Sequence, residues 1–218
     1  MSRRLQRNLV TAALVAGGLC AAFAIAGKEN AVEGVSFATA YVGAALLAVT
    51  LCLGPLNLMR GVPNPVSTHI RRDAGIWAAT TGIAHTLFGL QVHMGGRLSA
   101  YFVLPRFDGG SRLDASTIFV TANYMGALGT ILLIFLLALS SDFALRRAGT
   151  RRWKSLQRSS YWLAIVVAVH GGLYQALEKR PIGAMAVFGM LIVAVIFFQL
   201  RGVVIFRRRA DGGRGPMT

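Results

Sequence analysis

The sequence predicts an all-α fold, a bundle of six transmembrane helices that forms a single membrane domain over residues 1–218. Three observations lead to this prediction. Of the 218 residues, 55% are hydrophobic and 14% are charged, whereas about 25% of the residues of a soluble domain are charged. The mean hydropathy is +0.57. Six stretches of about 17–25 residues carry no charge, which is the length that a helix needs to cross a bilayer.

The six predicted spans take up most of the chain, and charged residues, glycine or proline border each of them. We expect them over residues 9–27, 37–59, 74–95, 116–141, 159–177 and 182–200. In a second interpretation the sixth span continues past Arg201 to Phe206. The last segment, 207–218, is expected to be a basic tail in the cytoplasm. These spans leave no room for a soluble catalytic domain.

The first span has two interpretations. Arg3, Arg4 and Arg7 precede an apolar run that ends in Ala-Ile-Ala at 24–26, and a secretory signal peptide has the same pattern. Because the run is long for the apolar part of a signal peptide, we favour a retained helix.

The positive charges predict how the bundle is oriented. The formal net charge is +15, from 23 Lys and Arg against 8 Asp and Glu. With the N-terminus in the cytoplasm, 17 of these positive charges lie inside and 6 lie outside, as the positive-inside rule requires. The six are Lys28, Arg97, Arg106, Arg112, Lys179 and Arg180. We therefore expect a multi-pass protein of the bacterial cytoplasmic (inner) membrane with both termini inside.

The basic charge does not require nucleic acid as a partner, because topology and anionic membrane lipid account for it. The two cysteines, Cys20 and Cys52, lie in apolar runs and form neither a CxxC nor a CxxCH motif. This excludes the common zinc and covalent haem motifs. We interpret both thiols as buried small hydrophobic side chains.

Two of the four histidines are predicted to lie at the same depth in the membrane. His85 follows Asp73 by 12 residues, which places it about 18 Å into the third span at 1.5 Å per residue. His170 follows Ser159 by 11 residues and lies about 17 Å into the fifth span. Both spans enter from the same side, so the two imidazoles reach the middle of a hydrocarbon core about 30 Å thick.

Matched histidines on two helices are typical of the axial ligands of a b-type haem. Glycines near them, at 82, 89, 171 and 172, would let a flat macrocycle approach the backbone, although small residues also serve helix packing. The alternative is that each histidine is a hydrogen-bonded polar residue of the bundle interior.

The other two histidines have simpler interpretations. His69 is expected in the loop between the second and third spans, as an interfacial residue. His93 lies 8 residues after His85, about 12 Å further outward, with no histidine at its level on another span. We interpret it as an interfacial polar residue. Three methionines that could ligate iron, Met94, Met125 and Met185, are interpreted as packing residues.

Two groups of short motifs follow each other in the middle of the chain. The first consists of Gly-Pro-Leu at 54–56, Arg-Arg-Asp-Ala-Gly-Ile-Trp-Ala at 71–78, and His85. The second consists of Leu-Ala-Leu-Ser-Ser at 137–141, Arg-Trp-Lys-Ser-Leu-Gln-Arg at 152–158, and then Tyr161 and His170. Their order and spacing resemble the ferric reductase-like transmembrane family, in particular its MsrQ branch, over about residues 43–177.

The resemblance implies that b-type haem lies between the third and fifth helices and that His85 and His170 are the axial ligands of its iron. Relatives with two haems carry a second, inner pair of histidines, which would fall at Arg71 and Gln157 here. MsrQ-like proteins have Leu-His-Arg where this chain has Leu-Gln-Arg at 156–158. We therefore expect one haem b per chain.

Four arginines near the inner ends of the spans have two interpretations that stay open. Their charges would suit the phosphate of a flavin such as FMN, and they also satisfy the positive-inside rule as solvated loop residues. They are Arg71, Arg72, Arg152 and Arg158.

The leading functional hypothesis is an electron-transfer subunit of an oxidoreductase system. Electrons would come from a quinol or a flavoprotein and pass to an acceptor on the outer side, such as a periplasmic reductase subunit. The chain has no GxGxxG fingerprint of its own for a nicotinamide cofactor, and no residue is predicted as catalytic. Two alternatives are a stand-alone transmembrane oxidoreductase for ferric iron, oxygen or quinone, and a haem-free transporter or structural membrane protein.

Overall fold

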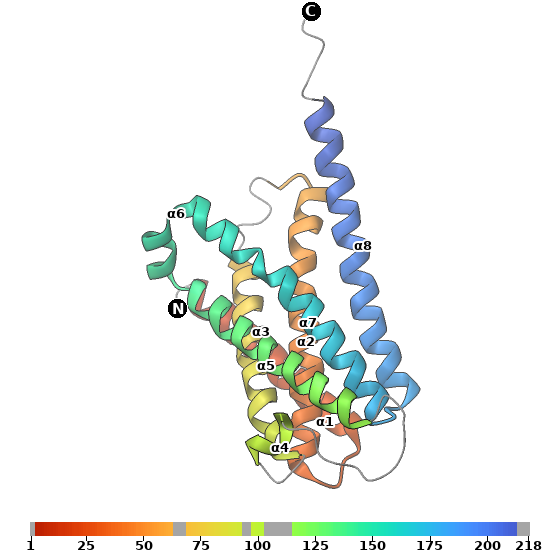
Figure 1. Cartoon of the computed structure of the whole chain (residues 1–218). Helices are drawn as coiled ribbons and strands as arrows, with labels where there is room; N and C mark the ends of the chain where they lie inside the picture. Colours follow the sequence, from red (N-terminus) through yellow and green to blue (C-terminus); the bar gives the residue numbers. More distant parts are fainter. Residues whose placement is uncertain (1–2, 63–68, 93–96, 103–114, 213–218) are drawn as a thin grey trace, which may run out of the picture.

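The computed structural model describes residues 3–62, 69–92, 97–102 and 115–212, and the regular secondary structure of these residues is helical throughout. This confirms the prediction of an all-α bundle (Figure 1). The helices are α1 (Arg3–Ala26), α2 (Ala31–Met59), α3 (His69–Val92), α4 (Leu98–Phe102), α5 (Ala115–Leu139), α6 (Asp142–Gln157), α7 (Ser159–Leu177) and α8 (Ile182–Gly212).

Five helical segments of the described residues are long and apolar enough to cross a membrane, as expected of an integral membrane protein. They are Leu5–Ala26, Ala31–Met59, Thr117–Leu139, Asp142–Leu177 and Ile182–Arg209. The third predicted span corresponds to α3, which has 24 residues but is not among the five. Its first turns carry Arg71, Arg72 and Asp73, and the remainder carries three threonines, His85 and Gln91, so the whole helix is less apolar than the other spans.

The structure differs from the sequence prediction in three places, two at the ends of helices and one in a connecting segment. His69 is the first residue of α3 and is not in a loop. The helix α8 continues to Gly212, so that residues 207–212 of the predicted tail are helical, and the candidate span within α8 ends at Arg209. The segment between the fourth and fifth predicted spans forms the helix α6, which has no buried residue.

Local capping explains why α6 is helical. Ser141 is its N-cap and accepts a hydrogen bond from the backbone N–H of Ala144 at 3.1 Å, which satisfies one of the free donors of the first turn. Gly149, at φ +71°, breaks the helix in the middle. The indole Nε1 of Trp153 donates to the carbonyl of Leu139 at 2.7 Å and thereby ties α6 to the end of α5.

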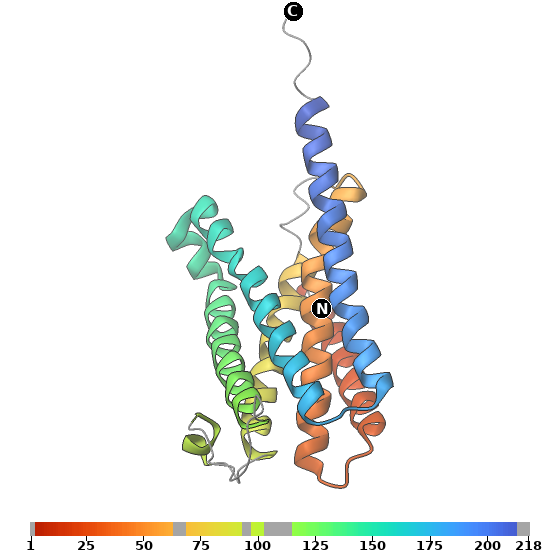
Figure 2. The ribbon, with the colours of Figure 1, turned by 45° about the vertical axis from the view of Figure 1, so that its right-hand side comes forward.

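The helices form two groups. In the first, α2 lies in the centre and packs against α1, α3 and α8; in the second, α5 packs against α7, and α3 joins the groups through its contact with α5. The two views show α5, α6 and α7 together on one side of the α2 group (Figures 1 and 2). The core consists of Leu47 and Leu51 of α2, Ala78 of α3 and Leu163 of α7.

Side chains from two neighbouring helices stabilise α2 where Pro55 interrupts its hydrogen bonds. Proline has no N–H, so the carbonyl of Leu51 loses its partner within the helix. Gln199 of α8 donates to this carbonyl at 2.8 Å. Arg71 of α3 donates to the adjacent carbonyl of Thr50 at 3.0 Å. The carbonyl that the proline leaves without a helical partner, together with the carbonyl before it, therefore connects α2 to α3 and α8.

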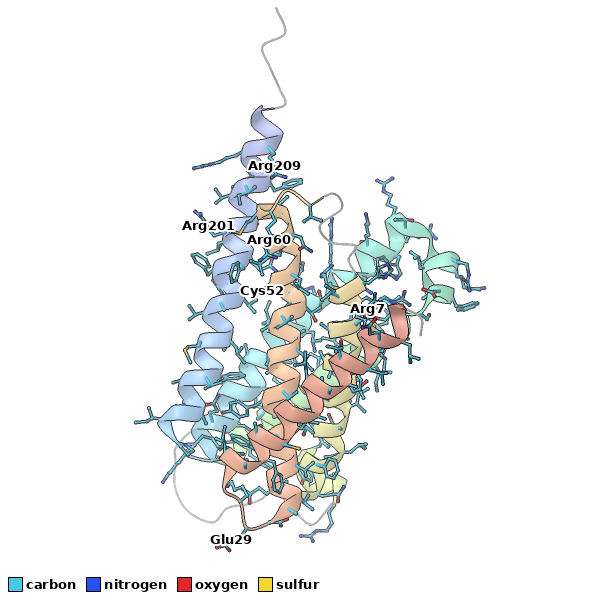
Figure 3. The ribbon with its side chains drawn as sticks, turned by 180° about the vertical axis from the view of Figure 1, so that it is seen from behind. Arg7, Glu29, Cys52, Arg60, Arg201 and Arg209 are labelled. Carbon is cyan, nitrogen blue, oxygen red and sulfur yellow. The ribbon has the colours of Figure 1, made fainter. Side chains whose placement is uncertain are left out.

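The bundle has two ends of different character. Figure 3 shows Arg60, Arg201 and Arg209 toward one end, which we call the arginine end, and Glu29 at the opposite end, which we call the Glu29 end. Ion pairs connect elements at both: Arg7–Asp73 and Arg72–Asp142 are on the side of the arginine end, and Lys28–Glu33 and Arg180–Glu178 on the side of the Glu29 end.

Candidate functional site

A cavity of about 420 Å³ lies between α2, α3, α5 and α7, in the size range of cofactor pockets. His85 of α3 and His170 of α7 both line it. Their ring centroids are 6.2 Å apart and their planes are inclined by 72°. Two helices that are distant in the sequence thus bring the two mid-span histidines to face each other across one space.

Backbone carbonyls fix the protonation of both imidazoles. Nδ1 of His85 lies 2.9 Å from the carbonyl oxygen of Ser36, and Nδ1 of His170 lies 2.7 Å from that of Ala122. Because a carbonyl only accepts hydrogen bonds, Nδ1 is the protonated nitrogen in each ring. In a neutral imidazole this leaves the lone pair of Nε2 free. Metal-bound histidines in proteins have this arrangement.

The separation of the rings fits one metal ion between them. A bond from a metal to an imidazole nitrogen is about 2.0 Å long, and the ring centre lies about 1.1 Å behind that nitrogen. Two imidazoles on opposite sides of one ion therefore have centroids about 6.2 Å apart, as observed here. Among the described residues no three His, Cys, Asp or Glu gather into a metal site. Two protein ligands suit a macrocycle that supplies the remaining four.

Glycines leave space for the two histidine rings. A Cβ atom on Gly126 of α5 would lie 2.8 Å from Cε1 of His170, so this glycine permits the imidazole to pack against the backbone of α5. Gly89 lies behind His85, where a Cβ would be 3.8 Å from Cε1. Of the four glycines predicted near the site, three line the cavity: Gly82, Gly89 and Gly171. A Cβ on Gly172 would meet nothing within 4 Å.

A network of hydrogen bonds surrounds His170 on the side of the Glu29 end. The ring of Tyr174 lies 5.0 Å from that of His170, and its hydroxyl donates to Oδ1 of Asn123 at 2.5 Å. Nδ2 of Asn123 donates to the carbonyl of Tyr101 at 3.1 Å. Asn123 follows Ala122, the residue that accepts from His170. The network therefore connects α4, α5 and α7 at the level of the histidine.

The sequence prediction did not identify these supporting residues. Asn123 and Gln175 are polar residues inside apolar spans, and this is a signal that could have marked them. Ser36 and Ala122 act through backbone carbonyls, and Gly126 acts through the absence of a side chain, so no residue pattern identifies them.

The four arginines near the inner ends of the spans do not converge on this cavity. Arg71 donates to Thr50, as described above, and Arg72 pairs with Asp142 at 2.7 Å. Arg152 and Arg158 are exposed on and after α6. Of the four, Arg72 lines a second cavity of about 810 Å³, beside Arg7, His69, Trp77 and other residues.

The remaining predicted residues lie in several environments. Met125 lines the cavity between the histidines, whereas Met185 is 45% exposed. Cys52 is buried, as expected, but Cys20 is exposed on the surface of α1, because α1 packs on the bundle through one face. His93 and Met94 lie outside the described residues.

Comparison with known proteins agrees with this geometry. The family of the ferric reductase like transmembrane component matches residues 39–168, which include α3 and α5 in full and the first ten residues of α7, and the match ends two residues before His170. One relative is the protein-methionine-sulfoxide reductase heme-binding subunit MsrQ of Azospira oryzae. It is 30% identical over 173 residues, which are 78% of this chain and 64% of the relative. The chain thus matches less than two thirds of that protein's length. No solved structure matches.

Proposed function

Because the chain belongs to the family of ferric reductase like transmembrane components, we propose that it is a membrane subunit that binds one haem b and transfers electrons through it. The observation that carries this proposal is the pair His85 and His170, whose ring centroids lie 6.2 Å apart and whose Nδ1 atoms both bond a backbone carbonyl. The name of the Azospira relative, a heme-binding subunit, supports the same assignment.

His85 and His170 would hold the iron through Nε2, and the bound haem would supply one-electron redox chemistry. The Nδ1–H groups donate to Ser36 and Ala122 and thereby fix the ring orientations and make Nε2 more basic. A more basic ligand favours oxidised iron, so these two hydrogen bonds would lower the reduction potential of a bound haem. The apolar residues of the cavity exclude water from both imidazoles.

The charge distribution supports an orientation of the bundle in the membrane. We propose that the arginine end faces the cytoplasm, since it carries Arg60, Arg201 and Arg209 (Figure 3). Electrons would then reach the histidine site from a quinol in the bilayer or a flavoprotein inside, and the Glu29 end would face the acceptor. Because the relative is a subunit of a methionine sulfoxide reductase by name, a periplasmic reductase is the acceptor that we propose.

We propose haem as the resident cofactor in preference to FMN. The second cavity contains two ion pairs, Arg7–Asp73 and Arg72–Asp142. Of the four arginines that would suit a flavin phosphate, only Arg72 lines this cavity, and Arg152 and Arg158 are exposed on and after α6, so the four do not converge on one phosphate.

An absorbance spectrum of the purified protein, oxidised and then reduced with dithionite, tests the proposal. We expect a Soret band and the sharp α band of a low-spin bis-imidazole haem on reduction. Colourless protein from cells supplied with haem precursor would contradict the proposal and favour a transporter or a structural role. If the dithionite-reduced protein in nanodiscs stays reduced when it is mixed with ferric chelate or with quinone, this result would argue against a stand-alone oxidoreductase.

A further inference from the structure

The histidine cavity has a polar end. Its lining toward the Glu29 end includes Glu33, Tyr41, Gln175, Glu178 and Arg180, whereas its opposite part is lined by apolar residues such as Leu47, Ala78 and Leu133. The His85 and His170 rings lie between these two regions. A ligand that fills the cavity therefore meets charge at one edge and hydrocarbon at the other.

Two buried polar atoms at this end have no hydrogen-bond partner among the described residues. They are the hydroxyl of Tyr41 and Oε1 of Gln175, and Gln175 is only 9% exposed. Buried polar atoms in proteins are nearly always paired. Since both residues line the cavity, a ligand with polar groups at this end would supply the missing partners.

A strained turn brings Arg180 to the same place. The backbone N–H of Glu178 donates to Tyr174 at 2.9 Å and that of Arg180 to Gln175 at 3.3 Å. Between them Lys179 has φ +46°, which is unfavourable for a residue with a side chain. As a result the guanidinium carbon of Arg180 lies 5.0 Å from the ring centroid of Phe37, next to Ser36, the partner of His85.

The charges at this end leave Arg180 able to take an anion. Glu33 is neutralised by Lys28 at 2.5 Å. Arg180 pairs with Glu178, but a guanidinium has five N–H donors and can serve a second carboxylate. The Tyr41 hydroxyl adds another donor. The amide of Gln175 can donate or accept, because its two ends have the same shape.

We propose that Arg180, with Tyr41 and Gln175, anchors the propionate carboxylates of the haem that His85 and His170 hold. The assignment rests on the proposed function, and it fixes the orientation of the macrocycle. The charged edge of haem faces Arg180, and the apolar edge faces Leu47, Ala78 and Leu133, because carboxylates are costly to bury among hydrocarbon side chains.

The test measures how fast the detergent-solubilised protein releases its cofactor to an excess of apomyoglobin. Wild type is compared with Arg180→Gln and with Lys179→Gln, the matched control, because Lys179 is an exposed cation one residue away. Each protein is loaded either with haem b or with haem dimethyl ester, in which both propionates are neutral.

We expect Arg180→Gln to release haem b about ten- to a hundredfold faster than wild type, as for the loss of a partner that supports a cofactor. Lys179→Gln should release it at the wild-type rate. The dimethyl ester should leave wild type faster than haem b does, and Arg180→Gln should add nothing to that rate. A faster release without the ester dependence would indicate a merely structural role for Arg180 and contradict the anchor.

If Arg180→Gln does not fold, the wild-type protein alone still tests whether the propionates are anchored. Equal release of haem b and its dimethyl ester would overturn the anchor and leave the haem proposal intact. Failure of wild type to take up any haem would overturn the proposed function itself.

Discussion

The protonation of His85 and His170 is set by two backbone carbonyl groups. Each Nδ1–H donates to a carbonyl of a neighbouring helix, Ser36 of α2 or Ala122 of α5. Both imidazoles are therefore held in the tautomer that exposes Nε2. The hydrogen bonds also fix the rotation of each ring, which a metal ligand requires.

At this scale we expect His85→Ala or His170→Ala to abolish the low-spin bis-imidazole spectrum, because either change removes one of two axial ligands. Optical and EPR spectra of the purified variants check this. His69→Ala is the control within the described residues, since His69 is exposed at the start of α3, and His93→Ala should also leave the spectrum intact. Normal low-spin haem in either cavity variant would show that the ligands are misassigned.

The two histidines could be found from the sequence because depth along a span follows from counting residues. Their partners could not, because every residue offers a carbonyl and position alone makes those of Ser36 and Ala122 useful. Arg180 was counted among the outer charges, but the turn at Lys179 that directs it over the cavity has no signature, since lysine rarely adopts a positive φ.

On the scale of single helices, α5 contributes to the site through two glycines, whose missing side chains leave space. Gly126 lets His170 approach the helix backbone, and Gly129 also lines the cavity. The sequence of α5 is that of an ordinary apolar span, so the role of these glycines could not be predicted from it.

We expect Gly126→Ala to weaken haem binding about ten- to a hundredfold, because the added methyl group displaces the imidazole of His170. Alanine is about 1 kcal/mol more favourable than glycine inside a helix, so a loss of haem would not come from a weaker helix. The measurement is haem occupancy after titration, together with a thermal melt of the apoprotein. Gly172→Ala, which adds a Cβ in open space, is the control, and equal occupancy in both variants would argue against the packing role of Gly126.

The helix α6 illustrates a limit of predictions that rely on hydropathy. Its charged residues, among them Arg146, Arg147 and Arg151, mark it as a connecting segment in a search for apolar spans. The helix is instead marked by hydrogen bonds, because Ser141 caps its first turn and Trp153 donates to the carbonyl of Leu139.

On the scale of the whole molecule, the cavity lies between two groups of helices that meet through α3. The α2 group supplies His85 through α3, and the α5–α7 pair supplies His170. The position that corresponds to an inner ligand on α3 is taken by Arg71, whose Nε donates to the carbonyl of Thr50 beside the Pro55 interruption. This guanidinium stabilises α2, and its side chain offers no usual ligand for haem iron.

We therefore expect one haem per chain. Pyridine haemochrome analysis combined with a protein assay by amino-acid analysis measures the ratio directly. Arg71→Ala, which leaves His85 and His170 in place, should keep the ratio near one. A ratio near two in wild type would mean that Gln157 or another group supports a second haem.

The sequence by itself determined the class of the protein, because a low density of charges and runs of apolar residues are properties of the chain that any membrane fold must satisfy. It also marked His85 and His170 as candidate ligands, because an ionisable residue in the middle of a membrane is energetically costly and therefore rare. The tertiary structure alone decided which nitrogen each histidine exposes, the 6.2 Å between the rings, and the polar end of the cavity at Arg180. These depend on how α2, α3, α5 and α7 approach one another, and backbone carbonyls, glycines and a turn of unusual φ set that approach without a local pattern.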